Sequence, residues 1–309
     1  MKKLISLFLM LLLTVTAVLF TGCGKEPYLI ALTNQSKAYV EVYDITEGKI
    51  DESSLVWSYK LPYNNIAGVK FRHSKTHGDV VLAVCGNNYG CMVSYPEGEI
   101  VWSTVSAASN PHSIELMPNS VIAIASSDGN EIRFYTTDKQ YNSKPAASVI
   151  LDDAHGVLWD EENEVLWAVG GSVLAAYKVT LNEDNTVTVI EDTALRADIP
   201  GFFAHDLAPV YGNKDALWIT TKGSVFMFNK TTKEFVTDYE GSEILDCDNV
   251  KGVGNFDDGS VVYIYPDGEY QSWTSKTVYF LKNGVEESIS LVSEDGHFYK
   301  VRVWDTRYQ

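Results

Sequence analysis

The chain beyond residue 27 is a succession of short apolar or alternating runs, separated by Gly, Asn, Asp and Pro. The runs at 120–125 and 131–135, for example, are joined by Ser-Asp-Gly-Asn, a typical turn sequence. Runs of this length and alternation are typical of β-strands, and no long helical period is seen between them. The pattern therefore predicts an all-β protein.

The runs recur as a unit of four. The reference unit begins at His112 and contains runs at 112–116, 120–125, 131–135 and 147–151. Equivalent first runs begin at residues 67, 112, 155, 205, 251 and 299, with steps of 45, 43, 50, 46 and 48. Propeller blades repeat every ~40–50 residues. We therefore predict a six-bladed β-propeller of four-stranded blades.

The two ends of the repeat complete each other. Runs at 28–32, 39–43 and 55–59 match the second, third and fourth strands of a blade, whereas 299–303 is a first strand with nothing after it. We expect the C-terminal strand to join the N-terminal blade, because a closed ring leaves no open sheet edge. Residues 28–309 form the propeller domain in this interpretation.

The first 22 residues have the order of an export signal. Lys2 and Lys3 precede an uncharged apolar stretch at 4–20, and small residues follow. The Thr-Gly-Cys end resembles a bacterial lipobox, with Phe20 where Leu is usual. The resemblance implies a lipoprotein-type signal peptide at 1–22, lipidation of Cys23, a short tether at 23–27 and an extracytoplasmic position in the cell envelope, anchored to a bacterial membrane. A plain signal peptide is the alternative.

The formal net charge is −17, which argues against nucleic-acid binding because phosphate neutralisation needs a basic face. It also argues against docking on anionic lipid. We expect a monomer that meets the membrane only through its N-terminal lipid. Export permits disulfides, so Cys85 and Cys91, which flank a turn, either close a hairpin or remain two reduced thiols, and Cys247 stays unpaired.

Polar side chains open the predicted inner strands. His112, His155 and His205 begin three consecutive first runs, and Lys251 and Tyr299 hold the same register in two others. Because inner strands surround the propeller axis, we expect these side chains to lie together at one central mouth.

Three interpretations of this ring stay open. Our principal one is a binding pocket, since concave sites with a few convergent polar groups bind ligands, and His, Lys and Tyr suit a small or glycan-type ligand such as an acidic sugar. The second is a metal site in which His112, His155 and His205 hold Zn²⁺ or Mn²⁺ for a lyase or hydrolase, with Tyr299 or Lys251 as acid or base. The third is structural, each imidazole bonding only backbone.

Other candidates are weaker. Asp153 and Asp206, beside the imidazoles, either orient them or are turn residues, and Trp159 is a core residue or a stacking platform. We interpret the acidic runs at 160–162 and 257–258 as solvated turns. No Gly-rich phosphate loop, Gly-x-Ser-x-Gly or Cys-x-x-Cys is present, so no catalytic residue is identified, and a scaffold for protein partners remains a further alternative.

The starts Pro-His-Ser-Ile, Ala-His-Gly-Val and Ala-His-Asp-Leu resemble the blade starts of lyase-type and gluconolactonase-like propellers. Residues 27–309 as a whole resemble an uncharacterised family of exported bacterial propeller lipoproteins. The first resemblance implies a His cluster at the mouth as a metal site by position only. The second implies the fold and an envelope location, and brings no known activity.

Overall fold

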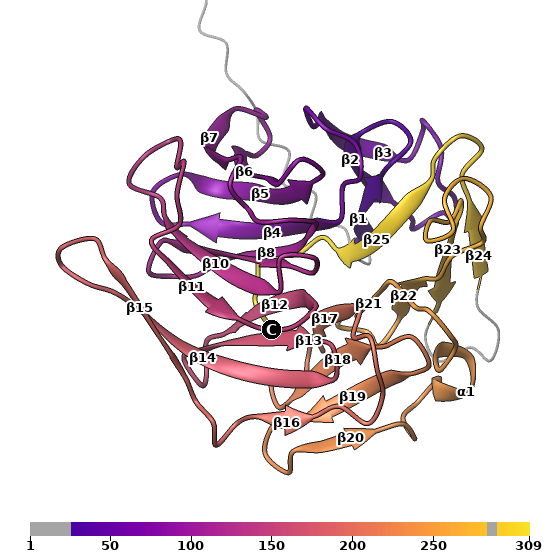
Figure 1. The fold of residues 1–309 in the computed structure, drawn as a ribbon. Coiled ribbons are helices and arrows are strands. Elements are labelled where there is room, and N and C mark those ends of the chain that lie inside the picture. The colour runs from indigo at the N-terminus through magenta and orange to yellow at the C-terminus, as the bar shows by residue number, and fades with distance from the viewer. Residues whose placement is uncertain (1–25, 283–288) are drawn as a thin grey trace, which may run out of the picture.

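The computed structural model describes residues 26–282 and 289–309, whose strands form six antiparallel sheets arranged in a ring (Figure 1). The predicted six-bladed propeller of four-stranded blades is confirmed. The innermost strands are β25 (Phe298–Val303), β4 (Gly68–Ser74), β8 (Pro111–Leu116), β12 (Ala154–Asp160), β17 (Asp206–Pro209) and β21 (Gly252–Asn255). The second strands are β1 (Leu29–Asn34), β5 (Gly78–Cys85), β9 (Val121–Ser126), β13 (Val165–Gly170), β18 (Ala216–Thr220) and β22 (Val261–Ile264).

The outer half of each blade follows the same order. The third strands are β2 (Tyr39–Asp44), β6 (Tyr89–Ser94), β10 (Glu131–Thr136), β14 (Val173–Leu181), β19 (Val225–Asn229) and β23 (Thr277–Leu281). The outermost strands are β3 (Leu55–Lys60), β7 (Ile100–Thr104), β11 (Ala147–Ile150), β15 (Val187–Glu191), β20 (Glu234–Val236) and β24 (Ile289–Val292). The fourth blade gains a short fifth strand, β16 (Ala197–Asp198), which pairs with β14, and one turn of helix, α1 (Ser242–Leu245), lies in the fifth-to-sixth blade connection. Within the described residues, no helix is long and apolar enough to cross a membrane.

The ring closes through its two ends, as predicted. Strand β1 pairs antiparallel with β25, with Ile30 opposite Val303 and Leu32 opposite Val301. The first blade is therefore built from both ends of the propeller domain, and β25 covers the inner edge of β1.

Each blade buries both of its faces against neighbours. In β13, Leu166 packs into a cluster shared with the third blade, whereas the next residue, Trp167, packs into a cluster shared with the fifth. Six such clusters occur, one between each pair of adjacent blades. The two-residue alternation of a strand thus sends successive side chains into different interfaces, which is why one blade cannot fold alone.

Small residues let the inner strands approach one another near the axis. A Cβ added at Gly156, directly after His155, would lie 2.7 Å from the Cβ of Leu207 on the next inner strand. A Cβ added at Gly68 would lie 2.6 Å from the carbonyl oxygen of His112. Glycine at these starts therefore brings the mouth residues of neighbouring blades within reach of one another.

The inner strands give the ring two distinct openings. The mouth is the opening where these strands begin, and the far opening is where they end. Residues 304–309 cross the far opening, where the carbonyl of Arg307 accepts hydrogen bonds from Arg72 (3.1 Å) and from the Tyr211 hydroxyl (3.3 Å). The Tyr308 hydroxyl donates to the carbonyl of Leu116 (2.6 Å). The chain's last residues therefore tie several blades together there.

Candidate functional site

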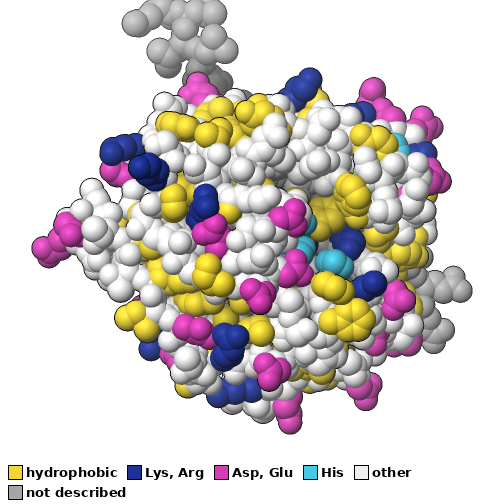
Figure 2. Space-filling model, in the orientation of Figure 1, with side chains coloured by type: hydrophobic (Ala, Val, Ile, Leu, Met, Phe, Trp, Pro, Cys, Tyr) yellow, Lys and Arg dark blue, Asp and Glu magenta, His cyan; other side chains and the backbone are white. Residues whose placement is uncertain are grey.

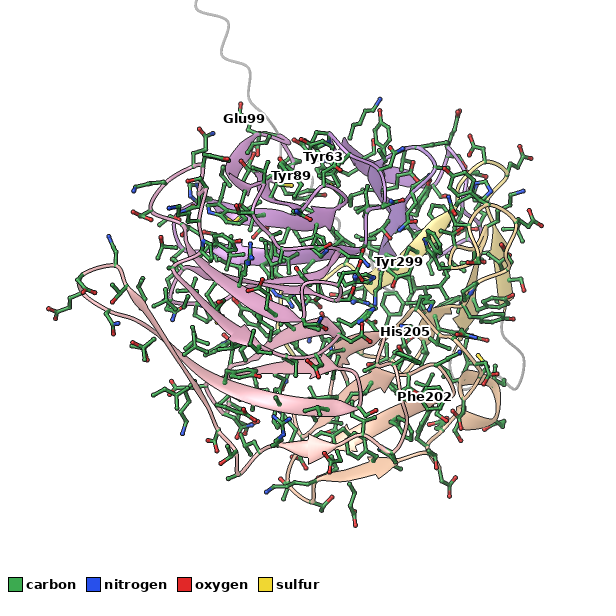
Figure 3. All side chains as sticks on the ribbon, in the orientation of Figure 1. Tyr63, Tyr89, Glu99, Phe202, His205 and Tyr299 are labelled. Atoms are coloured by element: carbon green, nitrogen blue, oxygen red, sulfur yellow. The ribbon has the colours of Figure 1, made fainter. Side chains whose placement is uncertain are left out.

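The mouth opens into a cavity of about 610 Å³. Four of the five sequence-predicted residues line it: His112, His155, His205 and Tyr299. Figure 2 shows the imidazoles at the bottom of a hollow, and Figure 3 shows His205 and Tyr299 close to the centre of the ring. The fifth residue, Lys251, is not part of the cavity wall and contacts it through His205.

The structure brings the three imidazoles together. The ring centroids of His112 and His155 are 4.2 Å apart, and those of His155 and His205 are 5.5 Å apart. Tyr299 completes the row, with its ring centroid 5.8 Å from that of His112. Residues separated by 43 and 50 positions in the chain are thus neighbours, because each begins an adjacent inner strand.

Backbone carbonyls fix the orientation of two of the imidazoles. Nδ1 of His112 lies 2.9 Å from the carbonyl of Asn110, and Nδ1 of His155 lies 2.8 Å from that of Asp153. A carbonyl only accepts, so Nδ1 carries the proton in both rings and Nε2 keeps its lone pair in the neutral form. Burial, the neighbouring His155 and Lys300 hold the pKa of His112 well below its ordinary value. His112 is therefore a neutral hydrogen-bond acceptor at pH 7.

His205 differs because it faces a lysine. Nζ of Lys251 lies 2.8 Å from Nε2 of His205, so the ammonium donates to Nε2 and the ring proton sits on Nδ1, which is buried and finds no partner among the described residues. Burial and the adjacent Lys251 lower the pKa of His205 to about 2. Burial, Lys300 and Lys222 lower the pKa of Lys251 to about 8. Nε2 of His205, the nitrogen that would bind a metal in the mouth, is thus already hydrogen-bonded to Lys251.

No group of three or more His, Cys, Asp or Glu side chains in residues 26–282 and 289–309 is arranged to hold a metal ion. The three-imidazole metal site stays a prediction, and it requires Lys251 to release His205.

Beneath the imidazoles the channel is filled by two buried ion clusters. In the first, Glu115 accepts from Lys70 (2.7 Å) and from Arg72 (2.8 and 3.0 Å). Its three side chains are at most 4% exposed. Lys70 also donates to the carbonyl of Val157 on the fourth blade. Burial lowers the pKa of Lys70 to about 8, whereas Arg72 and Lys70 outweigh burial and lower the pKa of Glu115.

The second cluster repeats this arrangement around Asp206. Arg302 donates to the carboxylate at 2.6 and 2.5 Å, and Lys300 donates at 3.0 Å. Burial would raise the pKa of Asp206, but Arg302 and Lys300 lower it to about 2. Taken together the two clusters hold four basic side chains and two carboxylates, an excess of two positive charges under the mouth of a chain whose net charge is −17.

Sequence reasoning missed this charged layer. Its signal is present as two Lys-x-Arg pairs, Lys70 with Arg72 and Lys300 with Arg302, each on an innermost strand. Asp206, considered as an imidazole-orienting or turn residue, serves instead as the carboxylate of the second cluster. Asp153 does contact an imidazole, with a carboxylate oxygen 3.1 Å from Nδ1 of His155.

Exposed aromatic rings lie around the mouth and were also missed. Trp273 lines the cavity, is 40% exposed and is held by a 2.9 Å hydrogen bond from its Nε1 to Oε1 of Gln35. Phe202 and Phe203 are 57% and 51% exposed in the loop that leads to His205 (Figure 3). Amide side chains, including Asn65 and other Asn and Gln residues at 35, 87, 88 and 110, also line the cavity, as does Asp128. These residues lie on loops, where the strand repeat gives no register to predict them.

The remaining candidates from the sequence are structural. Cys85 and Cys91 are both free and buried, so of the two alternatives the reduced pair is observed, and burial raises the pKa of Cys85 to about 12. Cys247 is also free. Trp159 belongs to the core.

One of the acidic turns was misread. Asp160 is fully buried and accepts hydrogen bonds from Lys230 (2.7 Å) and Trp167 (2.9 Å), so the interpretation of its whole run as a solvated turn is wrong. A carboxylate that closes a hairpin and pairs with the next blade cannot be distinguished from a solvated one by sequence pattern alone.

The fold and the mouth define a six-bladed propeller suited in general terms to a binding or scaffold role. A family model described as a family of unknown function, DUF6528, matches residues 92–284, more than half of the chain, and the chain belongs to this family. No curated protein matches the sequence. A solved structure of a protein of unknown function from Bacteroides caccae is similar, with 9% identity and a TM-score of 0.59 over 89% of this chain and 98% of that chain. That likeness shows the fold alone.

Proposed function

We propose that this protein is a lipid-anchored, extracytoplasmic propeller that binds an anionic, glycan-type ligand, such as a carboxylate-bearing sugar, at its central mouth. The observation that carries the proposal is the positively charged layer beneath the three imidazoles. Buried charges in a site of low dielectric act strongly on a ligand's charge.

The chemistry of the wall suits a sugar acid. The free Nε2 atoms of His112 and His155 accept hydrogen bonds from hydroxyl groups, and the amide side chains both donate and accept. Trp273 offers an exposed aromatic face at the rim, and flat aromatic rings give sugar rings an apolar contact. The excess positive charge below, with Lys251 beside His205, favours a carboxylate over a neutral group.

Calorimetric titration with galacturonate and with galactose tests this function, since the two sugars differ in charge at one carbon. We expect galacturonate to bind at least about tenfold more tightly, and His155→Ala and Trp273→Ala each to weaken it. His73→Ala is the matched control, because His73 is exposed at the end of β4 remote from the mouth. Equal affinity for both sugars, or equal loss in the control variant, would contradict the proposal.

A metal-assisted lyase or hydrolase is the second candidate. It is favoured by the hydrogen bonds from Nδ1 of His112 and His155 to backbone carbonyls. Histidines that bind a metal through one ring nitrogen are oriented by such a bond from the other nitrogen. Elemental analysis of the purified protein, with His155→Ala as control, tests it. Zinc or manganese retained by the native chain and lost in the variant would support this candidate, and no metal in either would remove it.

The lipid anchor rests on Cys23, which lies outside the described residues. Mass spectrometry of the N-terminal peptide tests it directly. We expect a diacylglyceryl modification on Cys23 that is absent from Cys23→Ser, and an unmodified Cys23 would contradict the anchor.

A further inference from the structure

A second cavity lies on the side of the propeller opposite the mouth. Strand β21 begins beside Lys251 at the mouth, so Phe256, Asp257 and Asp258, which follow its last residue, lie at the far end. These residues, the entry of the chain at 26–29 and the segment at 303–307 enclose about 520 Å³, here called the far pocket. Its volume is in the range of small-molecule sites.

The far pocket combines aromatic rings with carboxylates. Its wall includes four rings, contributed by Tyr28, Tyr211, Phe256 and Trp304. The carboxylates are those of residues 26, 257, 258 and 305, and Arg307 is the one basic residue among those that line the pocket. The wall therefore carries an excess of negative charge, opposite in sign to the layer under the mouth.

Two cations of the chain already sit on rings of this wall. The guanidinium carbon of Arg307 lies 5.1 Å from the centre of the Tyr211 ring, and the group pairs with Asp257 (2.9 Å) and Asp305 (2.6 Å). Nζ of Lys282 lies 5.5 Å from the centre of the Tyr28 ring. Both contacts are cation–π interactions. Tyr28 and Tyr211 therefore each meet a cation of the chain on a ring face, with acidic groups alongside, and a ligand cation would take the place of Lys282 or Arg307 there.

We propose that the far pocket binds an organic cation of the quaternary ammonium class. The ring faces attract a diffuse positive charge, the methyl groups of such a cation bury apolar surface against the rings, and the carboxylates supply long-range attraction. This site is separate from the mouth and does not depend on the function proposed there.

Choline and 3,3-dimethylbutan-1-ol test the proposal, because the two molecules have the same shape and only choline is charged. Titration of the full chain by calorimetry should give binding of choline at least about tenfold tighter than binding of the alcohol. The exposed pair Asp257→Asn/Asp258→Asn should weaken choline binding about fivefold or more without loss of fold. Asp128→Asn, the same substitution at the mouth, is the matched control and should leave choline binding unchanged.

A second variant separates the rings from the charges. Tyr211→Phe keeps the ring under Arg307 and should retain choline binding, whereas Tyr211→Leu, checked for its melting temperature, should lose it. Equal affinity for choline and the alcohol, an unchanged affinity in the double variant, or no binding of choline up to about 20 mM would overturn the proposal.

Discussion

Asp206 anchors the second buried ion cluster, and its replacement by Asn tests the charged layer. The carboxylate is 1% exposed and is held by Arg302 at 2.6 Å and by Lys300 at 3.0 Å. Removing one partner of a buried pair leaves uncompensated charge and costs about 3–5 kcal/mol. In a domain of this size each kcal/mol lowers the melting temperature by about 2–4 °C, so the melting temperature of Asp206→Asn should fall by roughly 6–20 °C.

The same carboxylate makes the free energy of unfolding depend on pH in acid. The pKa of Asp206, about 2, lies below its ordinary value of 3.8, a difference worth about 2 kcal/mol of folding free energy. Because the folded-state pKa is the lower one, this stability is present above about pH 4 and is lost as the pH falls toward about 2. The Asp206→Asn variant should not show this part of the decrease in stability at low pH.

Urea unfolding followed by circular dichroism, at pH 7 and at intervals down to pH 2, measures the free energy lost in the variant and the free energy lost in acid. Asp79→Asn is the control, because Asp79 is 46% exposed beside His73 and should change the free energy of unfolding by less than about 0.5 kcal/mol. An Asp206→Asn variant no less stable than this control, or one that keeps the full acid loss, would refute the reasoning.

Three further predictions concern other parts of the ring. Gly156→Ala should cost about 1–3 kcal/mol, because its Cβ would meet the next inner strand at 2.7 Å, whereas Gly223→Ala, with open space around it, should be near neutral in the same unfolding assay. Affinity for galacturonate should fall as the pH rises through about 8, because Lys251 loses its proton there. Calorimetry of Lys251→Met should show a smaller dependence of this affinity on pH. The same pH dependence in the variant and the native chain would contradict the role of Lys251. Tyr308→Ala should destabilise by about 2–4 kcal/mol, since the ring lies under the Arg72 guanidinium at 4.8 Å and closes the far opening, and calorimetric melting of Tyr308→Phe should show a smaller loss.

The fold was predictable because the strands recur at regular intervals along the sequence. Equivalent starts at six positions, and the two unmatched ends, indicate six blades and their closure without any side-chain detail. The same register predicted that His112, His155 and His205 would be neighbours, which the centroid distances bear out. The spacing of strands was sufficient to predict these neighbours, because residues at the same position of successive inner strands lie at the same level along the axis of a closed ring.

Much of the site was not predictable in the same way. The pairing of Asp206 with Lys300 and Arg302 joins residues 94 and 96 positions apart across the channel, and strand alternation does not specify which inner strands face each other there. Trp273 and Phe202 lie on loops, whose geometry the repeat does not define. The burial of Asp160 depends on Lys230 from the next blade, a partner the sequence pattern does not indicate.

Nitrogen-15 spectra of histidine-labelled protein, recorded at pH 7 with galacturonate and then with galactose, test most directly whether the imidazoles above the charged layer bind an acidic sugar. We predict a neutral, Nδ1-protonated signal for His112. The signals of His112 and His155, assigned by their loss in His112→Ala and His155→Ala, should both shift on addition of galacturonate. A doubly protonated His112 ring, or histidine signals that galacturonate leaves in place or that galactose moves equally, would contradict the account.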